Sequence, residues 1–128
     1  MSKYFTFKEM LHSTTANVKG FSNIPESIEH YKNLDRLMSV LDKAREKLGK
    51  PIFVNSGYRC VQLNKAVGGA ANSYHLTGRA ADITCFRKQD NEKLYAILEE
   101  MSWSLPEGVH IMELINEQNY TWIHVSIL

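Results

Sequence analysis

The sequence contains little cysteine, no excess of either charge and no long apolar run. Its 128 residues include two cysteines, too few for a disulfide scaffold and too far apart for a paired-cysteine metal site. Fifteen Lys and Arg against fourteen Asp and Glu give a net charge of +1 at pH 7, so the composition does not favour nucleic acid as a partner. The longest segment without a charged residue, 66–78, is rich in glycine and polar residues, so no membrane span is predicted.

Two common signals are also missing. Residues 1–9 lack the apolar stretch of a secretory signal, so we expect synthesis in the cytoplasm without a signal peptide. The helical HExxH motif of many metalloproteases is absent. What remains is the length and composition of one globular domain, with 44% hydrophobic and 23% charged residues. We expect this domain to be a monomer with neither a nucleic-acid nor a membrane partner.

The spacing of apolar residues predicts two long helices with a shorter one before them. Thr6 and Glu9 have the spacing of a capping box and predict that a short helix starts there. Pro25 suits the first turn of a second helix, which Gly49 ends. Asp90 is the predicted cap of a third helix. Apolar residues recur at helical spacing in both long helices: Ile28, Tyr31, Leu34, Met38, Leu41 and Leu48, then Leu94, Ile97, Leu98 and Met101.

Short apolar segments around these helices predict strands. Residues 13–24 and 60–79 show no period and are expected to be irregular, and the longer of the two is expected to be functional. The order of helices and short strands indicates one α+β domain over residues 1–128. The predicted strands are 51–55, 80–84, 109–115 and 121–127, the last two joined as a hairpin by 116–120.

Three residues are candidate metal ligands: His75, Asp82 and His124. Asp82 lies on a predicted strand face opposite its apolar neighbours, and His124 shares a face with Trp122 and Ser126. Two imidazoles and one carboxylate suit Zn²⁺ with a fourth position open for water, which is hydrolytic chemistry. A single histidine or aspartate on a strand is more often structural, so the spacing alone does not select this triad.

Several motifs around these residues follow one another along nearly the whole chain. They are FTFKE at 5–9, STTA at 13–16, SGYR at 56–59, LNKAVGG at 63–69, SYHLTGRAADI at 73–83 and WIHVS at 122–126. Together they closely resemble the zinc D-alanyl-D-alanine carboxypeptidase family, and within it the short phage- and prophage-associated branch. The resemblance implies a Hedgehog/DD-peptidase fold, an α+β domain with a small antiparallel sheet, flanked by helices, and one zinc site.

The resemblance also implies roles for individual residues. His75, Asp82 and His124 match the zinc ligands of the family. Arg59 matches an arginine that contacts the substrate and steadies the negative charge of the tetrahedral intermediate, a task that suits a guanidinium. The ordinary alternative for Arg59 is a surface ion pair. Ser73 matches a family serine that either binds substrate or fixes its loop.

The general base is the least defined part of this pattern. Some relatives have a glutamate three residues before the last histidine ligand, where this chain has Thr121, and others have a histidine at the position of Trp122. The short branch has a glutamate in a Q-[LV]-I-x-E pattern that aligns with residues 113–117. Glu117 is therefore the predicted base, with Glu113 in reserve. The alternative is that Glu117 is only a polar hairpin residue.

The function that the resemblance implies is that of a zinc metallopeptidase. Its substrate would be a peptide bond in peptidoglycan stem peptides or cross-bridges, cut as by a D-Ala-D-Ala carboxypeptidase or an endolysin-type endopeptidase. A phage-type release would bring the protein to the cell wall. A second hypothesis is a non-catalytic, zinc-containing module of a cell-wall-binding or phage structural protein. A third is a cysteine hydrolase that uses Cys60, because a neighbouring cation such as Arg59 favours the reactive thiolate form of a cysteine.

Overall fold

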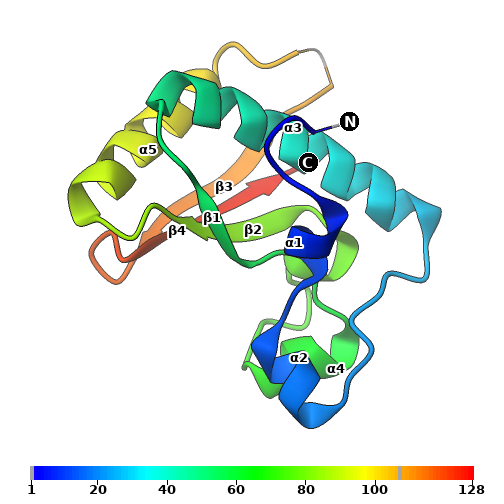
Figure 1. The fold of residues 1–128 in the computed structure, drawn as a ribbon. Helices are drawn as coiled ribbons and strands as arrows, with labels where there is room; N and C mark the ends of the chain where they lie inside the picture. Colours follow the sequence, from blue (N-terminus) through cyan, green and yellow to red (C-terminus); the bar gives the residue numbers. More distant parts are fainter. Residues whose placement is uncertain (1, 107) are drawn as a thin grey trace.

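The computed structural model describes residues 2–106 and 108–128 and confirms the predicted α+β fold. Its antiparallel strands form one sheet in the order β1-β2-β4-β3. Two long helices, α3 and α5, cover one face of this sheet (Figure 1), and the core lies between the helices and the sheet. The strands are β1 (Phe53–Ser56), β2 (Ala80–Thr84), β3 (Ile111–Glu117) and β4 (Trp122–Ile127).

Helix α3 (Ile28–Leu48) begins later than predicted. The hydroxyl of Ser27 accepts a hydrogen bond from the first turn and caps the helix, so Pro25 lies before the helix rather than in it. Gly49 ends α3 as predicted, with a φ of 73°. Most of the predicted apolar stripe faces the core, but Ile28 is 76% exposed. Among the described residues, no helix is both long enough and apolar enough to cross a membrane.

Helix α5 (Lys88–Met101) is the third predicted helix. Its cap position is Arg87 rather than Asp90. Asp90 lies in the first turn instead, where its carboxylate pairs with the Lys50 ammonium at 2.9 Å. The predicted apolar residues Leu94, Leu98 and Met101 are buried in the core.

The first short helix, α1 (Phe7–Leu11), starts where the capping box predicts. The hydroxyl of Thr6 accepts a hydrogen bond from the Glu9 N–H at 3.2 Å, which satisfies a backbone donor that the first turn leaves free.

The prediction of irregular structure over 13–24 and 60–79 is wrong in part. Both segments contain short helices, and side chains of Ser13 and Cys60 cap the two α-helices. Helices this short show no apolar period, so caps and tertiary contacts decide whether they form. Helices α2 and α4 contact each other in a lobe below the sheet (Figure 1), which we call the α2–α4 lobe. The helices are α2 (Thr14–Lys19), α4 (Val61–Ala66) and a 3₁₀ helix, η1 (Tyr74–Thr77).

The predicted hairpin is formed by β3 and β4, with strand ends that differ from the prediction. The ladder reaches the pair Glu117–Trp122, so the connection is shorter than 116–120. The turn has positive φ at three successive residues: Gln118, Asn119 and Tyr120. Asn91 of α5 fixes this turn, because its amide group donates to the Tyr120 carbonyl oxygen at 2.8 Å.

We predict that Asn91→Leu destabilises the protein. The Asn91 side chain is 1% exposed, and its Oδ1 atom also accepts from the Cys85 N–H at 2.7 Å. Leucine would leave these partly buried backbone groups unsatisfied, so we expect the free energy of unfolding to fall by about 2 kcal/mol or more. Urea denaturation measures this loss. Gln89→Leu on the exposed side of the same helix is the control, and we expect it to change stability by less than about 0.5 kcal/mol.

Candidate metal centre

The register of the sheet places the predicted ligands side by side. Asp82 on β2 pairs with Ser56 on β1 and with His124 on β4, which in turn pairs with Ile115 on β3. Cross-strand partners point to the same face of a sheet. Asp82 and His124 therefore lie next to each other on the face opposite the core, as the alternation of the strands predicts.

His75 reaches the same place from η1. Its side chain is buried, and its Nδ1 atom lies 2.6 Å from the Gly57 carbonyl oxygen. Because a carbonyl oxygen only accepts, Nδ1 must carry the proton, and the lone pair of Nε2 is left free to bind a metal. That Nε2 atom lies 3.5 Å from Asp82 Oδ1. Ser73 caps η1 with its hydroxyl, which accepts from the His75 N–H, so it does fix its loop.

Gly57 is a part of the site that the sequence indicates only weakly. A side chain there would collide with the backbone oxygen of Met10, so only glycine lets this carbonyl reach His75. The sequence suggests close approach of the chain at glycines in general, but it does not tell which carbonyl meets which imidazole.

Both ring nitrogens of His124 have carboxylate partners. Nδ1 lies 2.9 Å from Asp82 Oδ1, and Nε2 lies 2.9 Å from Glu113 Oε1. One ligand atom from each of His75, Asp82 and His124 lies within 4.8 Å of the others. Two nitrogens and one oxygen at this separation suit a single borderline divalent cation such as Zn²⁺.

The electrostatics of the cluster keep Asp82 ionised. Burial alone would raise the pKa of Asp82, but the neighbouring imidazoles of His124 and His75 outweigh it and hold that pKa far below its usual range. Burial opposes protonation of His124, yet Asp82 and Glu113 raise its pKa above the ordinary value. The ionised Asp82 therefore stabilises a positive charge next to it, which either a protonated histidine or a metal cation can supply.

Arg59 forms an ion pair within the site rather than on the surface. Its Nη2 atom lies 3.2 Å from Asp82 Oδ2, and its Nε and Nη1 atoms donate to Ser56 and Asn64. The guanidinium thus holds the oxygen of Asp82 that does not face the histidines. A guanidinium has five N–H groups, so two remain available.

The triad opens into a cavity of about 630 Å³. Glu117 and Trp122 line it together with the three candidate ligands. The Glu117 side chain is half-buried, and no hydrogen bond or ion pair of its carboxylate is present among the described residues. Trp122 shares the ligand face of β4, as the strand alternation predicts. All seven predicted site residues lie here: Arg59, Ser73, His75, Asp82, Glu113, Glu117 and His124.

Comparison with known proteins agrees with this geometry. Residues 3–126 match the family model described as Peptidase M15. The chain belongs to the peptidase M15 family. It is also similar to a protein of Streptomyces albus G named zinc D-Ala-D-Ala carboxypeptidase, with 52% identity over 44 residues. That segment is 34% of this chain and 17% of the relative, so the chain covers less than two thirds of the relative's length. The family resemblance predicted from the motifs is confirmed.

The candidate nucleophile Cys60 and the remaining histidines of this M15 family member lie outside the triad. Cys60 caps α4, because its Sγ atom accepts from the Leu63 N–H at 3.4 Å, and it does not line the metal cavity. Within residues 2–106 and 108–128, the metal-ligating group includes none of His12, His30 and His110.

We predict that the M15 triad binds one Zn²⁺ per chain and that His124→Ala loses it. Removing one of three protein ligands leaves too few donors for tight binding, whereas the core on the other face of the sheet keeps the domain folded. Metal analysis after dialysis measures zinc content, and thermal melts with and without zinc measure the stabilisation by the ion. His110→Ala, an exposed histidine outside the triad, should keep its zinc. A zinc-bound His124→Ala protein would contradict the assignment.

Proposed function

We propose that this chain is a zinc metallopeptidase that hydrolyses a peptide bond in the stem peptides or cross-bridges of peptidoglycan. The observation that carries this proposal is the convergence of His75, Asp82 and His124 at an open, polar cavity. The name of the Streptomyces relative supports both the metal and the substrate class. The protein would act on the cell wall as a monomer.

The proposed metal ligands are Nε2 of His75, Oδ1 of Asp82 and Nδ1 of His124, the atoms that face one another. Zn²⁺ bound there would supply Lewis-acid polarisation of the scissile carbonyl and would make the attacking water more acidic. Arg59 would keep Asp82 ionised and in place from its far oxygen. With its two remaining N–H groups it would bind the substrate carboxylate or the developing oxyanion.

The two glutamates of β3 have different partners and so different proposed roles. Glu113 and Glu117 lie four residues apart on one strand and point to the same face. Glu113 faces Nε2 of His124, where it would accept the ring N–H and leave Nδ1 free for the metal. Glu117 lines the same cavity without a partner among the described residues.

Glu117 is therefore the proposed general base. Its carboxylate would take the proton of the attacking water and deliver it to the leaving amine. Glu113 is the proposed positioning residue, since it acts on the reaction through His124. Ser73 caps η1 and also lines the cavity, so it has a second proposed role in binding the substrate.

We predict that Glu117→Gln lowers kcat by about 10²- to 10⁴-fold, because the amide cannot accept the proton. Zinc content should not change, since Glu117 is not a ligand. The measurement is the release of free amines from cross-linked wall fragments, alongside metal analysis. Glu92→Gln on the exposed side of α5 makes the same chemical change away from the site and should keep full activity. Bound zinc with no amine release by the wild-type protein would indicate the non-catalytic module instead.

The role of Glu113 predicts a contrast between two substitutions. Glu113→Gln keeps an oxygen that accepts from His124, so zinc affinity should remain close to that of the wild type. Glu113→Leu removes the acceptor and should weaken zinc binding by about 10- to 100-fold. Competition with a chromophoric chelator measures both. Loss of hydrolysis in Glu113→Gln with zinc affinity retained would show instead that Glu113 is the base.

A further inference from the structure

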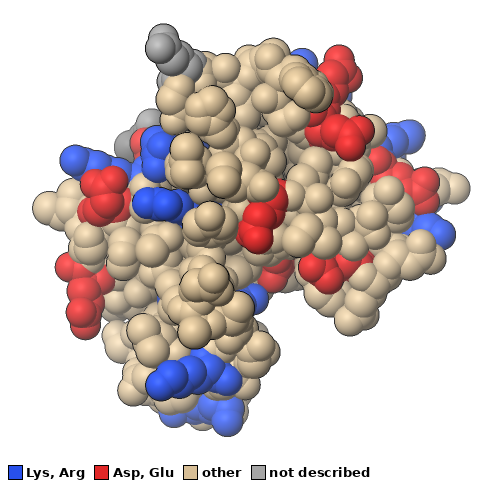
Figure 2. Space-filling view, turned by 180° about the vertical axis from the view of Figure 1, so that it is seen from behind, with Lys and Arg blue, Asp and Glu red and all other residues tan. Residues whose placement is uncertain are grey.

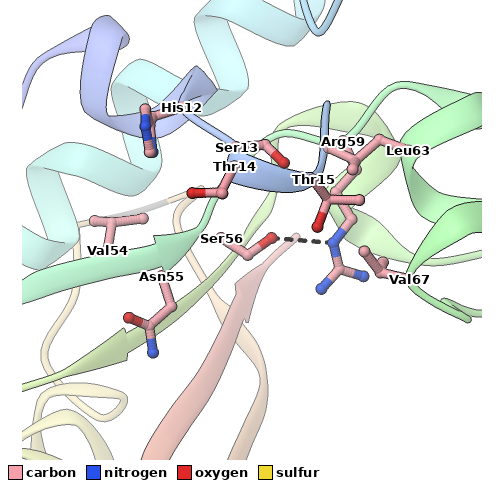
Figure 3. Close-up of a pocket in the computed structure, with 10 residues that line it drawn as sticks. All are labelled: His12, Ser13, Thr14, Thr15, Val54, Asn55, Ser56, Arg59, Leu63 and Val67. Carbon is pink, nitrogen blue, oxygen red and sulfur yellow. Dashed lines mark hydrogen bonds between the residues drawn. The ribbon is translucent and has the colours of Figure 1, made fainter. Parts of the chain in front are cut away.

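A second cavity adjoins the metal cavity at Arg59, the residue that lines both. Its volume is about 390 Å³. Figure 3 shows that it is lined from three sides: by residues 12–15 before and within α2, by 54–56 at the end of β1, and by Arg59 with side chains of α4 and its end. The two cavities are therefore neighbours that share the Arg59 side chain.

Several polar side chains of the second cavity are available to hydrogen-bond a ligand. Thr14, Thr15 and Asn55 make no side-chain hydrogen bond in the part of the chain that the structure describes. Arg59 adds a positive charge, and no Asp or Glu belongs to the lining. Hydroxyl, amide and guanidinium donors around a cavity without carboxylates suit a ligand group that is rich in acceptors and negatively charged.

The surroundings of this cavity carry the same sign of charge. Segments 11–25 and 55–81, which contain α2 and α4, have no acidic residue. They contribute Lys19 and Lys65 to the α2–α4 lobe, and Figure 2 shows only basic charged side chains on the visible face of that lobe, at the bottom of the view. Elsewhere on the same face both signs are interspersed. The field over the lobe therefore favours an anion.

The strand beside the cavity also offers a backbone surface. β1 is an edge strand that pairs only with β2, and no other backbone hydrogen bond to 53–56 is present among the described residues. An extended peptide can add to such an edge. Ser56 at the end of β1 is the cross-strand partner of Asp82, so the first metal ligand lies one strand further in from the end of this edge.

We propose that the second cavity is a subsite that binds a carboxylate-bearing residue of the peptide substrate, with the peptide extended along β1 and its cleaved bond at the metal centre. The inference rests on the proposed function and adds to it a site outside the metal cavity that selects acidic peptides. Thr15 and Asn55 would donate to the carboxylate together with Arg59.

The test uses peptides in which the carboxylates are converted to carboxamides one at a time. With the wild-type protein, amidation of one carboxylate should lower kcat/KM by about tenfold, through KM, because a hydrogen-bonded charge is lost. Thr15→Val and Asn55→Leu should lower kcat/KM for the carboxylate peptide about tenfold with little change in kcat. Neither variant should affect the carboxamide peptide. Asn17→Leu, at an exposed position of α2 outside the lining, should behave as the wild type.

A second measurement separates this inference from the proposed function. Binding of the same peptides to zinc-loaded Glu117→Gln, measured by calorimetry, reports the subsite without any turnover. If the wild-type protein hydrolyses no peptide but carboxylate peptides still bind more tightly than carboxamide peptides, the proposed activity is overturned and the subsite is supported. Equal binding of every carboxylate and carboxamide pair would overturn the subsite. Because Asn55 is exposed, its substitution keeps the fold and tests the cavity even if Thr15→Val destabilises α2.

Discussion

The site depends on the contacts of the Asp82 carboxylate with two imidazoles and one guanidinium. One of its oxygens faces the imidazoles of His75 and His124, and the other is held by Arg59. The two imidazoles and the guanidinium come from different parts of the chain. Asp82 is the one side chain that contacts all three. A buried carboxylate with such partners stays ionised at neutral pH, which is the state a divalent cation requires.

The hydrophobic core sets the geometry of that carboxylate from the other face of the sheet. Ile83 beside Asp82, and Ile123 and Val125 on either side of His124, are fully buried. Because strand side chains alternate, burying these three residues turns both ligands to the opposite face. A slip of one residue in register would turn the ligands into the core, so the packing of α3 and α5 on the sheet also fixes the metal centre.

Residues that contact the candidate metal ligands determine which ring nitrogen of each histidine can bind a metal. The Gly57 carbonyl selects the tautomer of His75, and Glu113 occupies the outer nitrogen of His124. Glu117, four residues along the same strand, has no such partner among the described residues, and the two roles proposed for these glutamates are based on this difference. Arg59 contacts Asp82 and also lines the second cavity, so one guanidinium would take part in both metal binding and substrate selection.

The sequence by itself determined the two long helices, the strands and the ligand faces, because these depend on periods of three to four or of two residues within one segment. It also singled out His75, Asp82 and His124 through the family motifs. Tertiary contacts, together with local caps, decided whether the short helices α2 and α4 form, and tertiary structure alone decided the contact of Gly57 with His75 and that of Glu113 with His124. These features depend on contacts between residues far apart in the chain, which no local period records.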